Sequence, residues 1–420
     1  MAAGGCAGRA APWVAGTEDA RVGEMQPNVS LWWASDLAIE VVEHKGIGHP
    51  DTICDALAEE LSVGLCRWYL DRFGTVLHHN VDKALLCGGA ARVGFGGGEV
   101  LAPIEILLAG RATGEVSGVR VPIEEIAIEG SRAWLRRNLR ALDVERHVEI
   151  RCKVRAGSEA LTHVFGKARA GVPLANDTSI GAGFAPATRL ERVVLACADA
   201  LGAMARDPAM PYVGEDVKVM GVRRGDAIRL TVACALVAKH VANLAAYREA
   251  REGIAGALAR VARAEAQGEV HVVVNAADDL DASRVYLTAT GTSAESGDDG
   301  QVGRGNRVNR LITPCRPMTL EAAAGKNPIT HVGKLYQVAA HRLAAEVLCA
   351  VPEVVEAQCL LVSEIGSPIA SPSITDVRVR TRDGALAPAT ERAIAAAVVA
   401  ALPRALDLWR SIVAGEVTLF

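Results

Sequence analysis

The sequence lacks the features that mark membrane, secreted and nucleic-acid-binding proteins. No apolar run is long enough to cross a membrane, and the N-terminal stretch MAAGGCAGRAAPWVAG has no hydrophobic core of a secretory signal. The formal net charge of -4 gives no basic footprint for nucleic acid. We therefore expect a cytoplasmic protein with neither nucleic acid nor membrane as a partner, in which any anion site is built locally.

Two common site motifs are also missing. The ten cysteines form no Cys-x-x-Cys pair, and no histidine stands at metal-ligand spacing, so we expect reduced, mostly buried thiols. The Walker pattern G-x-x-x-x-G-K-[ST] is absent as well, which disfavours an ordinary P-loop fold.

Alternating apolar strands, often in pairs, are followed by long helices rich in alanine and leucine. The chain has 420 residues, of which 50% are hydrophobic, which favours several structural units. The pattern predicts an α+β fold of three similar α/β units, each a sheet covered by helices. Expected helices cover residues 50–73, 122–142, 190–204, 244–266 and 331–348, with a final helix ending near 413, and expected strands include 75–78, 103–111, 147–155 and 284–291. Residues 1–35 are expected to be a mobile N-terminal extension, and residues 36–420 to form a body of three interleaved units.

A glycine-rich, charged stretch runs from Gly291 to His331 without a clear regular element. Composition alone is equally compatible with a solvated, flexible turn. However, a structureless stretch of this length inside a compact domain is usually functional or disordered, and its apolar anchors argue against disorder. Free backbone amides with Arg304, Arg307 and Lys326 would bind a polyphosphate. Its aspartates, Asp298 and Asp299, would repel that anion unless Mg²⁺ bridges them.

The segment EHKGIGHPDTICD joins a predicted strand to a predicted helix. A His-Pro-Asp sequence before a helix is most often only a cap. Here His49 and Asp51 follow Gly46 and Gly48 at a helix N-terminus, which favours anionic ligands and disfavours protonation of the histidine. Asp51 is a candidate Mg²⁺ ligand, whereas Asp55, one turn later, could equally satisfy a lysine or a backbone amide.

Two further polar segments are candidates. In GEDVKVMG, strand alternation places Asp216 and Lys218 on the same side, either as a surface ion pair or as part of a site. In LANDTS, Asp177 lies in a polar cluster that is most often a turn motif.

Taken in order, these motifs resemble the archaeal-type methionine adenosyltransferases, also called S-adenosylmethionine synthetases. The resemblance runs from about Val41 to the terminal GEVTLF. It rests on the motifs KGIGHPDTICD, FGGGEV, VPLANDTS, GEDVKVMG, TGTSAE, GDDG, VGRGNRVN and AAAGKNP.

The resemblance implies transfer of the adenosyl group of ATP to the sulfur of L-methionine, with cleavage of the released tripolyphosphate to phosphate and pyrophosphate. It assigns His49 to the triphosphate near the reacting centre, and Asp51 and Asp82 to metal binding. Phosphate binding falls to Lys218, Arg304 and Lys326, and the other expected substrate-binding residues are Asp177, Asp216, Asp298, Asp299 and Arg307. It also implies two Mg²⁺ and often a K⁺ per site, a pseudo-threefold arrangement of the units, and a homodimer with active sites at its interface.

The sequence departs from the family pattern at five positions. The family usually has Arg at His44, HHNTDQ where this chain has HHNVDKA, Met at Ser296 and Phe at Cys315, so Val81 and Lys83 also differ. These changes motivate two alternatives: a paralogue that uses another nucleoside triphosphate or thioether, and a non-catalytic nucleotide-binding partner.

Overall fold

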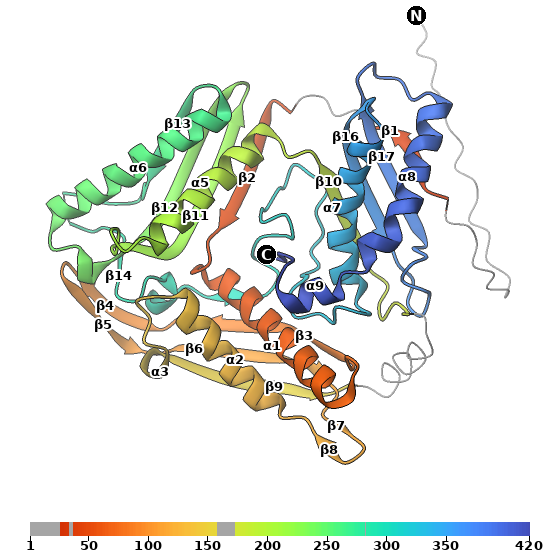
Figure 1. Cartoon of the computed structure of the whole chain (residues 1–420). Helices are drawn as coiled ribbons and strands as arrows, with labels where there is room; N and C mark the ends of the chain where they lie inside the picture. Colours follow the sequence, from red (N-terminus) through yellow and green to blue (C-terminus); the bar gives the residue numbers. More distant parts are fainter. Residues whose placement is uncertain (1–25, 33–36, 158–172, 282) are drawn as a thin grey trace, which may run out of the picture.

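Three main sheets, each covered by a pair of helices, make up the chain (Figure 1). The computed structural model describes residues 26–32, 37–157, 173–281 and 283–420. The first unit contains β3 (His79–Cys87), β6 (Ile104–Ala112), β9 (Val148–Ala156) and β15 (Gly300–Gln301), covered by α1 (Pro50–Phe73) and α2 (Ile123–Asn138). The second contains β2 (Ile39–Lys45), β11 (Val213–Arg224), β12 (Ala227–Val237), β13 (Val270–Val274) and β14 (Leu287–Thr288), covered by α5 (Arg189–Arg206) and α6 (Leu244–Ala266). The third contains β1 (Asn28–Leu31), β10 (Ile180–Ala185), β16 (Val354–Val362) and β17 (Ile374–Thr381), covered by α7 (Val332–Ala350) and α8 (Pro388–Leu406).

Smaller elements connect or extend these units. They are β4 (Ala90–Gly94), β5 (Gly97–Ala102), β7 (Glu115–Val116), β8 (Val119–Arg120), α3 (Val144–His147), η1 (Ala238–His240), η2 (Ser293–Ser296) and α9 (Trp409–Ala414).

The three sheets share one ladder pattern. Along the orders β15-β3-β6-β9, β2-β11-β12-β13 and β10-β16-β17-β1, the successive pairings are antiparallel, antiparallel and parallel. In each order, the first strand (β15, β2 or β10) is far in sequence from the strand with which it pairs. The three sheets are therefore similar in strand pairing, and each draws strands from distant parts of the sequence.

The helix α1 carries the first unit's core and ends at a glycine. Ile53, Leu57, Leu61 and Leu65 recur at helical spacing and are buried against the sheet. Gly74 follows with φ 68°, the left-handed conformation that closes a helix and that glycine adopts without steric cost.

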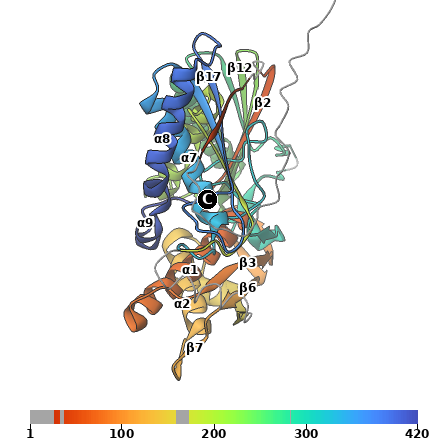
Figure 2. The ribbon, with the colours of Figure 1, turned by 90° about the vertical axis from the view of Figure 1, so that its right-hand side faces the viewer.

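The helices and the open faces of the sheets lie on opposite sides of the molecule. Figure 2 shows α1, α2, α7 and α8 toward one side and β2, β3, β6 and β12 toward the other. On the side away from the helices, Leu85 of β3 is 43% exposed and pairs in register with Leu107 of β6. Around Leu85, this side is therefore a sheet surface that none of the described helices covers.

Most predicted elements are confirmed, and the exceptions have local causes. The hairpin β11–β12 and the helix α6 lie where expected, but the helix predicted over 122–142 ends at Asn138. The strand predicted over 75–78 is wrong, because regular pairing starts at His79. The strand predicted over 284–291 is reduced to β14. The Tyr286 amide donates to the Asp278 side chain before it, and the Glu295 carboxylate accepts from the amides of Ala289 and Thr290 after it.

The N-terminal boundary differs from the sequence prediction. Residues Asn28–Leu31, assigned to the extension, form β1 and pair in parallel with β17. Residues 1–25 and 33–36 of the predicted extension lie outside the described residues. In the described part of the chain, no helix combines the length and apolarity that crossing a membrane requires.

Candidate active site

The strand β2 leads through a glycine turn into α1, and the turn lies against β11. The amides of Gly46 and Gly48 donate to the carbonyls of Val217 and Glu215 at 2.7 and 2.9 Å. A Cβ at Gly48 would lie 2.6 Å from the Asp216 amide nitrogen, so only glycine permits this approach. The turn thereby fixes where α1 begins.

His49 is the N-cap of α1 and is held neutral. Its Nδ1 accepts from the Asp51 amide at 3.2 Å. Burial, reinforced by the ammonium groups of Lys45 and Lys218, lowers the pKa of His49 to about 4, although Asp51 opposes this shift. The predicted neutral histidine is confirmed, with burial as its main cause.

Asp51 lies between a lysine and the charged loop. Its Oδ2 accepts from Lys45 Nζ at 2.9 Å, and its Oδ1 accepts from the Gln301 amide at 2.9 Å. Lys45 Nζ also donates to the carbonyl oxygen of Arg304 at 2.8 Å, and the Asn306 side chain bonds both the amide and the carbonyl of Lys45. The loop is therefore held against the first turn of α1.

Asp55, one turn along α1, supports the same loop. Its Oδ1 accepts from the Gly303 amide at 2.8 Å, while the buried Oδ2 has no hydrogen-bond partner within the described residues. Burial raises the pKa of Asp55 to about 7, although the Gly303 amide and Arg307 oppose it. The Arg307 guanidinium donates to the carbonyls of Gly303 and Gly305, so it stabilises the loop's own backbone.

Asp216 and Lys218 have different partners. The Asp216 carboxylate accepts from the amide and hydroxyl of Ser293 at 2.8 and 2.6 Å, and burial raises its pKa to about 6. Lys218 Nζ lies 3.3 Å from Glu43 Oε2. Of the two alternatives for these residues, the Asp216–Lys218 ion pair is therefore absent from the described residues. The pairing of β11 with β12 is irregular between Val213 and Val217, the part of the strand that holds Asp216.

A second group of charged side chains surrounds Lys326. Its buried ammonium contacts Asp82 and lies 3.2 Å from Glu321 Oε2, and Lys83 Nζ contacts the other Asp82 oxygen. Burial alone would raise the pKa of Asp82, but Lys326 and Lys83 outweigh it and lower the pKa to about 2. Asp177 lies in the same electrostatic environment, and burial raises its pKa.

A buried ion pair supports this second group. Lys334 Nζ lies 2.7 Å from Glu59 Oε2, and the same oxygen accepts from the Gly325 amide at 2.8 Å. Gly325 has φ +75°, and a Cβ there would lie 2.6 Å from the Val81 carbonyl oxygen. Glu59 thus fixes the backbone immediately before Lys326.

The chain brings the predicted residues together in two groups. We call His49, Asp51, Lys45, Asp55, Asp216 and Lys218 the His49 group, and Lys326, Asp82, Lys83, Glu321 and Asp177 the Lys326 group. Among the described residues, no hydrogen bond or ion pair joins side chains of the two groups. Arg304, Asp298 and Asp299 are exposed on the loop beside the His49 group, where Asp299 accepts from the Gly88 amide at 2.9 Å.

The carboxylates fit magnesium sites that a phosphate ligand completes. Within the described residues, no three His, Cys, Asp or Glu side chains gather as a ligand set. Mg²⁺ usually binds through one or two carboxylates together with phosphate oxygens, so a full protein cage is not needed. Asp51 and Asp82 each face an ammonium group, which shows that their oxygens are oriented toward a cation.

Sequence reasoning missed Lys45, Ser293 and Glu59. Lys45 had a signal, because it stands at the end of a predicted strand, directly before the glycine turn. Ser293 and Glu59 act through partners distant in sequence and had no local signal, whereas Lys334 is among the basic residues that follow the charged loop in the sequence.

The five departures from the family pattern lie in different surroundings. Val81 is buried in the first core, and Lys83 contacts Asp82. His44 Nδ1 lies 2.8 Å from the Arg310 carbonyl oxygen, Ser296 is exposed at the end of η2, and Cys315 is half-buried. Of these, Lys83 forms an ion pair with a predicted site residue, Asp82.

Comparisons with known proteins agree on one family. The family model described as S-adenosylmethionine synthetase (AdoMet synthetase) matches residues 28–416. A probable S-adenosylmethionine synthase of Aquifex aeolicus is 55% identical over 345 residues, covering 82% of this chain and 86% of the relative. The S-adenosylmethionine synthase of Haloarcula marismortui is 46% identical, covering 94% and 99%, and that of Aeropyrum pernix is 48% identical, covering 92% and 96%.

One solved structure has a similar fold. It is an unusual S-adenosylmethionine synthetase from Campylobacter jejuni, with a TM-score of 0.56 and 14% identity, covering 90% of this chain and 99% of that one. At this identity the likeness concerns the fold alone.

Proposed function

We propose an active site for this chain, which belongs to the S-adenosylmethionine synthetase family: the His49 group and the Lys326 group act together on one ATP and one methionine. The activity is S-adenosylmethionine synthesis, and the family implies ATP and methionine as its substrates. The observation that supports the proposed site is the division of the cationic and carboxylate side chains into two groups that remain separate within one chain.

The reaction needs anion stabilisation and no strong base. The methionine sulfur forms a bond to C5′ of ATP, and the C5′–O bond breaks with its electron pair leaving on tripolyphosphate. A thioether has no proton to lose, so no general base is required. Water then splits the tripolyphosphate to phosphate and pyrophosphate.

Neutral His49 suits a position beside the departing triphosphate. A pKa of about 4 keeps its imidazole uncharged at neutral pH, where it can donate or accept a hydrogen bond. Lys326, Lys218 and Arg304 would hold phosphate oxygens as charge develops in the transition state. Asp216, bonded to Ser293, would keep the segment before Asp298 in place.

Mg²⁺, which the family uses, would be held by Asp51 in the His49 group and by Asp82 in the Lys326 group. Once bound with the triphosphate, it supplies neutralising positive charge to the phosphate oxygens. Lys45 and Lys326 would turn from these carboxylates toward phosphate. We also propose that the enzyme requires K⁺, a monovalent cation, in addition to Mg²⁺.

We further propose that the units are related by a pseudo-threefold axis and that two copies pair through their uncovered sheet faces. The shared ladder pattern supports the first point. The exposed Leu85 and the position of the described helices α1, α2, α7 and α8 toward the opposite side support the second. In such a dimer, the His49 group of one copy would face the Lys326 group of the other.

The experiment compares His49→Ala with Lys326→Ala. We expect His49→Ala to lower the rate of S-adenosylmethionine formation by about 100-fold or more with little change in ATP affinity, because its contact strengthens in the transition state. Lys326→Ala should weaken both rate and triphosphate binding. Mass spectrometry identifies products from ATP, CTP, GTP and UTP with methionine, Mg²⁺ and K⁺.

The control is Arg392→Ala, an exposed residue on the helix α8, on the helix side of the molecule. Its rate should equal that of the unmodified protein. Equal, small effects of His49→Ala on rate and affinity would contradict the role assigned to His49. A sulfonium product formed preferentially from another triphosphate would contradict ATP as the nucleotide.

A further inference from the structure

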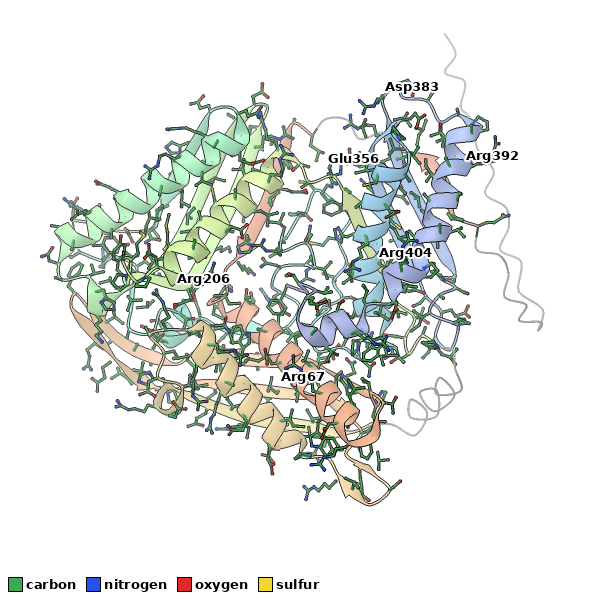
Figure 3. The ribbon with its side chains drawn as sticks, in the orientation of Figure 1. Arg67, Arg206, Glu356, Asp383, Arg392 and Arg404 are labelled. Atoms are coloured by element: carbon green, nitrogen blue, oxygen red, sulfur yellow. The ribbon has the colours of Figure 1, made fainter. Side chains whose placement is uncertain are left out.

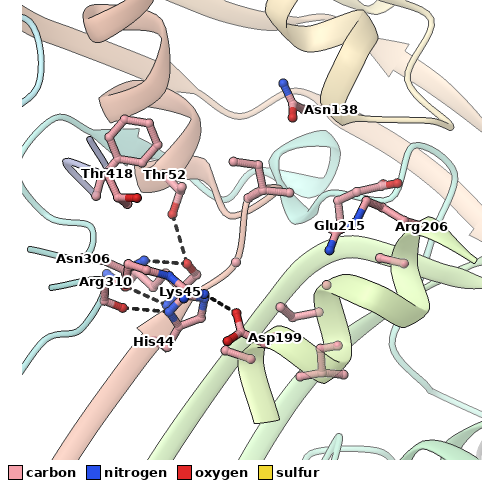
Figure 4. Close-up of a pocket in the computed structure, with 18 of the residues that line it drawn as sticks. His44, Lys45, Thr52, Asn138, Asp199, Arg206, Glu215, Asn306, Arg310 and Thr418 are labelled. Atoms are coloured by element: carbon pink, nitrogen blue, oxygen red, sulfur yellow. Dashed lines mark hydrogen bonds and ion pairs between the residues drawn. The ribbon is translucent and has the colours of Figure 1, made fainter. Parts of the chain in front are cut away.

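A cavity of about 630 Å³ lies behind the glycine turn of the His49 group. Its walls come from the end of β2, the start of α1, the end of α2, the second half of α5, β11 and the charged loop (Figure 4). Lys45 is the one residue of its lining that is also assigned above to phosphate binding. The cavity therefore lies behind the proposed active site and shares only Lys45 with its phosphate-binding and metal-binding residues.

Arginines outnumber the acids of this cavity. Arg140 Nε bonds Glu215 Oε1 at 2.8 Å, and Arg310 contacts Asp199, so each acid of the wall is already paired. The remaining arginines of the wall are Arg137 and Arg206. Arg137 lies 3.2 Å from Glu60, which is outside the cavity, and Arg206 makes no ion pair within the described residues. The wall has excess positive charge.

The cavity also has an apolar floor. Ile47, Leu201 and Val217 line it together with Phe420. A cavity of this size is in the range of small-molecule sites, which combine an apolar lining with a few placed polar groups. Guanidinium groups are the preferred partners of carboxylate and phosphate. The lining therefore matches a small organic anion with an apolar body.

The wall of the cavity is also the support of the glycine turn. Asn306, which bonds the amide and carbonyl of Lys45, lines the cavity, as does Val217, which accepts from the Gly46 amide. Glu215 accepts from the Gly48 amide through its backbone and from Arg140 through its side chain. A ligand here would restrain the segment that positions His49.

We propose that this cavity is a second ligand site, which binds a small organic anion bearing a phosphate or carboxylate group on an apolar ring or chain, and that binding there restrains the glycine turn of the active site. Arg206 and Arg137 bind the anionic group, and the apolar floor receives the ring. The site acts on the reaction from behind the catalytic turn, without contacting the substrates.

The test uses phenyl phosphate as the probe, measured by calorimetry on the full chain. We expect saturable binding with one probe per chain, and about a tenfold or greater loss of affinity in Arg206→Gln, since the substitution removes a charge-assisted hydrogen bond to the phosphate group. Arg392→Gln is the matched control, because Arg392 is an exposed arginine on α8 of another unit, far from Arg206 (Figure 3). Its affinity should be unchanged.

Two further measurements separate the outcomes. Inorganic phosphate should bind at least tenfold more weakly than phenyl phosphate, and the probe should slow hydrogen exchange at the amides of Gly46 and Gly48. Unchanged affinity for phenyl phosphate in Arg206→Gln would overturn the site. The site would also be overturned if tripolyphosphate displaced phenyl phosphate to the same extent from the unmodified protein and from Arg206→Gln. Equal binding of inorganic phosphate would overturn the ligand class, and unchanged exchange would overturn the restraint.

Discussion

Lys45 Nζ lies 2.9 Å from Asp51 Oδ2, joining the last residue of β2 to the first turn of α1. The lysine and aspartate side chains are only 10% and 8% exposed, and the same ammonium also bonds the Arg304 carbonyl. One buried cation therefore ties the strand, the helix and the charged loop together.

Lys45→Met should destabilise the protein by about 3–5 kcal/mol without Mg²⁺, because it leaves a buried carboxylate uncompensated. Urea unfolding measures the free energy. Arg92→Met is the control, since Arg92 and Glu99 form a pair at 3.9 Å with side chains that are 77% and 71% exposed, and it should change stability by less than about 0.5 kcal/mol. Equal effects of the two variants would show that the Lys45–Asp51 pair does not organise the turn.

His49 should not contribute a titration near pH 6.5. Burial and Lys45 lower its pKa to about 4, so it is neutral in the free enzyme at every pH above about 5. Between pH 5 and 8, kcat/KM should change with pH at the same pH values in His49→Asn as in the unmodified protein. Only the size of kcat/KM should be lower in the variant. A limb near 6.5 that disappears in His49→Asn would contradict the assignment.

Asp55 should make the protein less stable as pH rises through the range between its two pKa values. Its pKa is about 7 when folded against the ordinary 3.8, so between these values the native state binds the extra proton. Stability from this group is thus full below about pH 4 and is lost as pH rises toward 7. Asp55→Asn keeps an oxygen for the Gly303 amide and removes the charge.

We therefore expect Asp55→Asn to be more stable than the unmodified protein at pH 8, by about 1–3 kcal/mol, and similar to it at pH 4. Urea unfolding at several pH values measures this difference. A pH dependence identical in the two proteins would exclude the raised pKa.

The Glu59–Lys334 pair should show strong coupling in a double-mutant cycle. Burial raises the pKa of Glu59 even though Lys334 opposes it, so each charge depends on the other for compensation. Glu59→Gln and Lys334→Met should each cost about 3 kcal/mol or more, and the double variant should cost clearly less than their sum. Additive costs of the two substitutions would contradict strong coupling between Glu59 and Lys334. The control is a second double-mutant cycle on the exposed Arg284–Asp279 pair, at 2.7 Å, whose coupling should be below about 1 kcal/mol.

Local periodicity was sufficient to predict most elements of the fold. The helix α6 and the hairpin β11–β12 follow from apolar spacing and a short polar turn, because these signals lie within one segment. The shortening of the strand predicted over 284–291 could not be predicted, since it depends on the Asp278 and Glu295 carboxylates accepting backbone amides that a sheet would otherwise use.

The candidate site residues have signals in the local sequence, whereas their hydrogen-bond and ion-pair partners do not. The charged loop, His49 and Asp51 have local signals in glycines and a helix start. Asp216, however, bonds Ser293, which is 77 positions away in sequence, and Arg307 bonds its own loop's carbonyls. Such partners depend on tertiary structure, so strand alternation alone could not identify the partner of Asp216.

The measurement that tests the shared active site most directly is complementation between two inactive variants. His49→Ala and Lys326→Ala are co-expressed, so that random pairing makes about half of the dimers hybrid. In each hybrid, one site carries both substitutions and the other carries neither. The account predicts S-adenosylmethionine synthesis at about a quarter of the unmodified rate, whereas activity no greater than that of the separate variants would contradict a site formed by two copies.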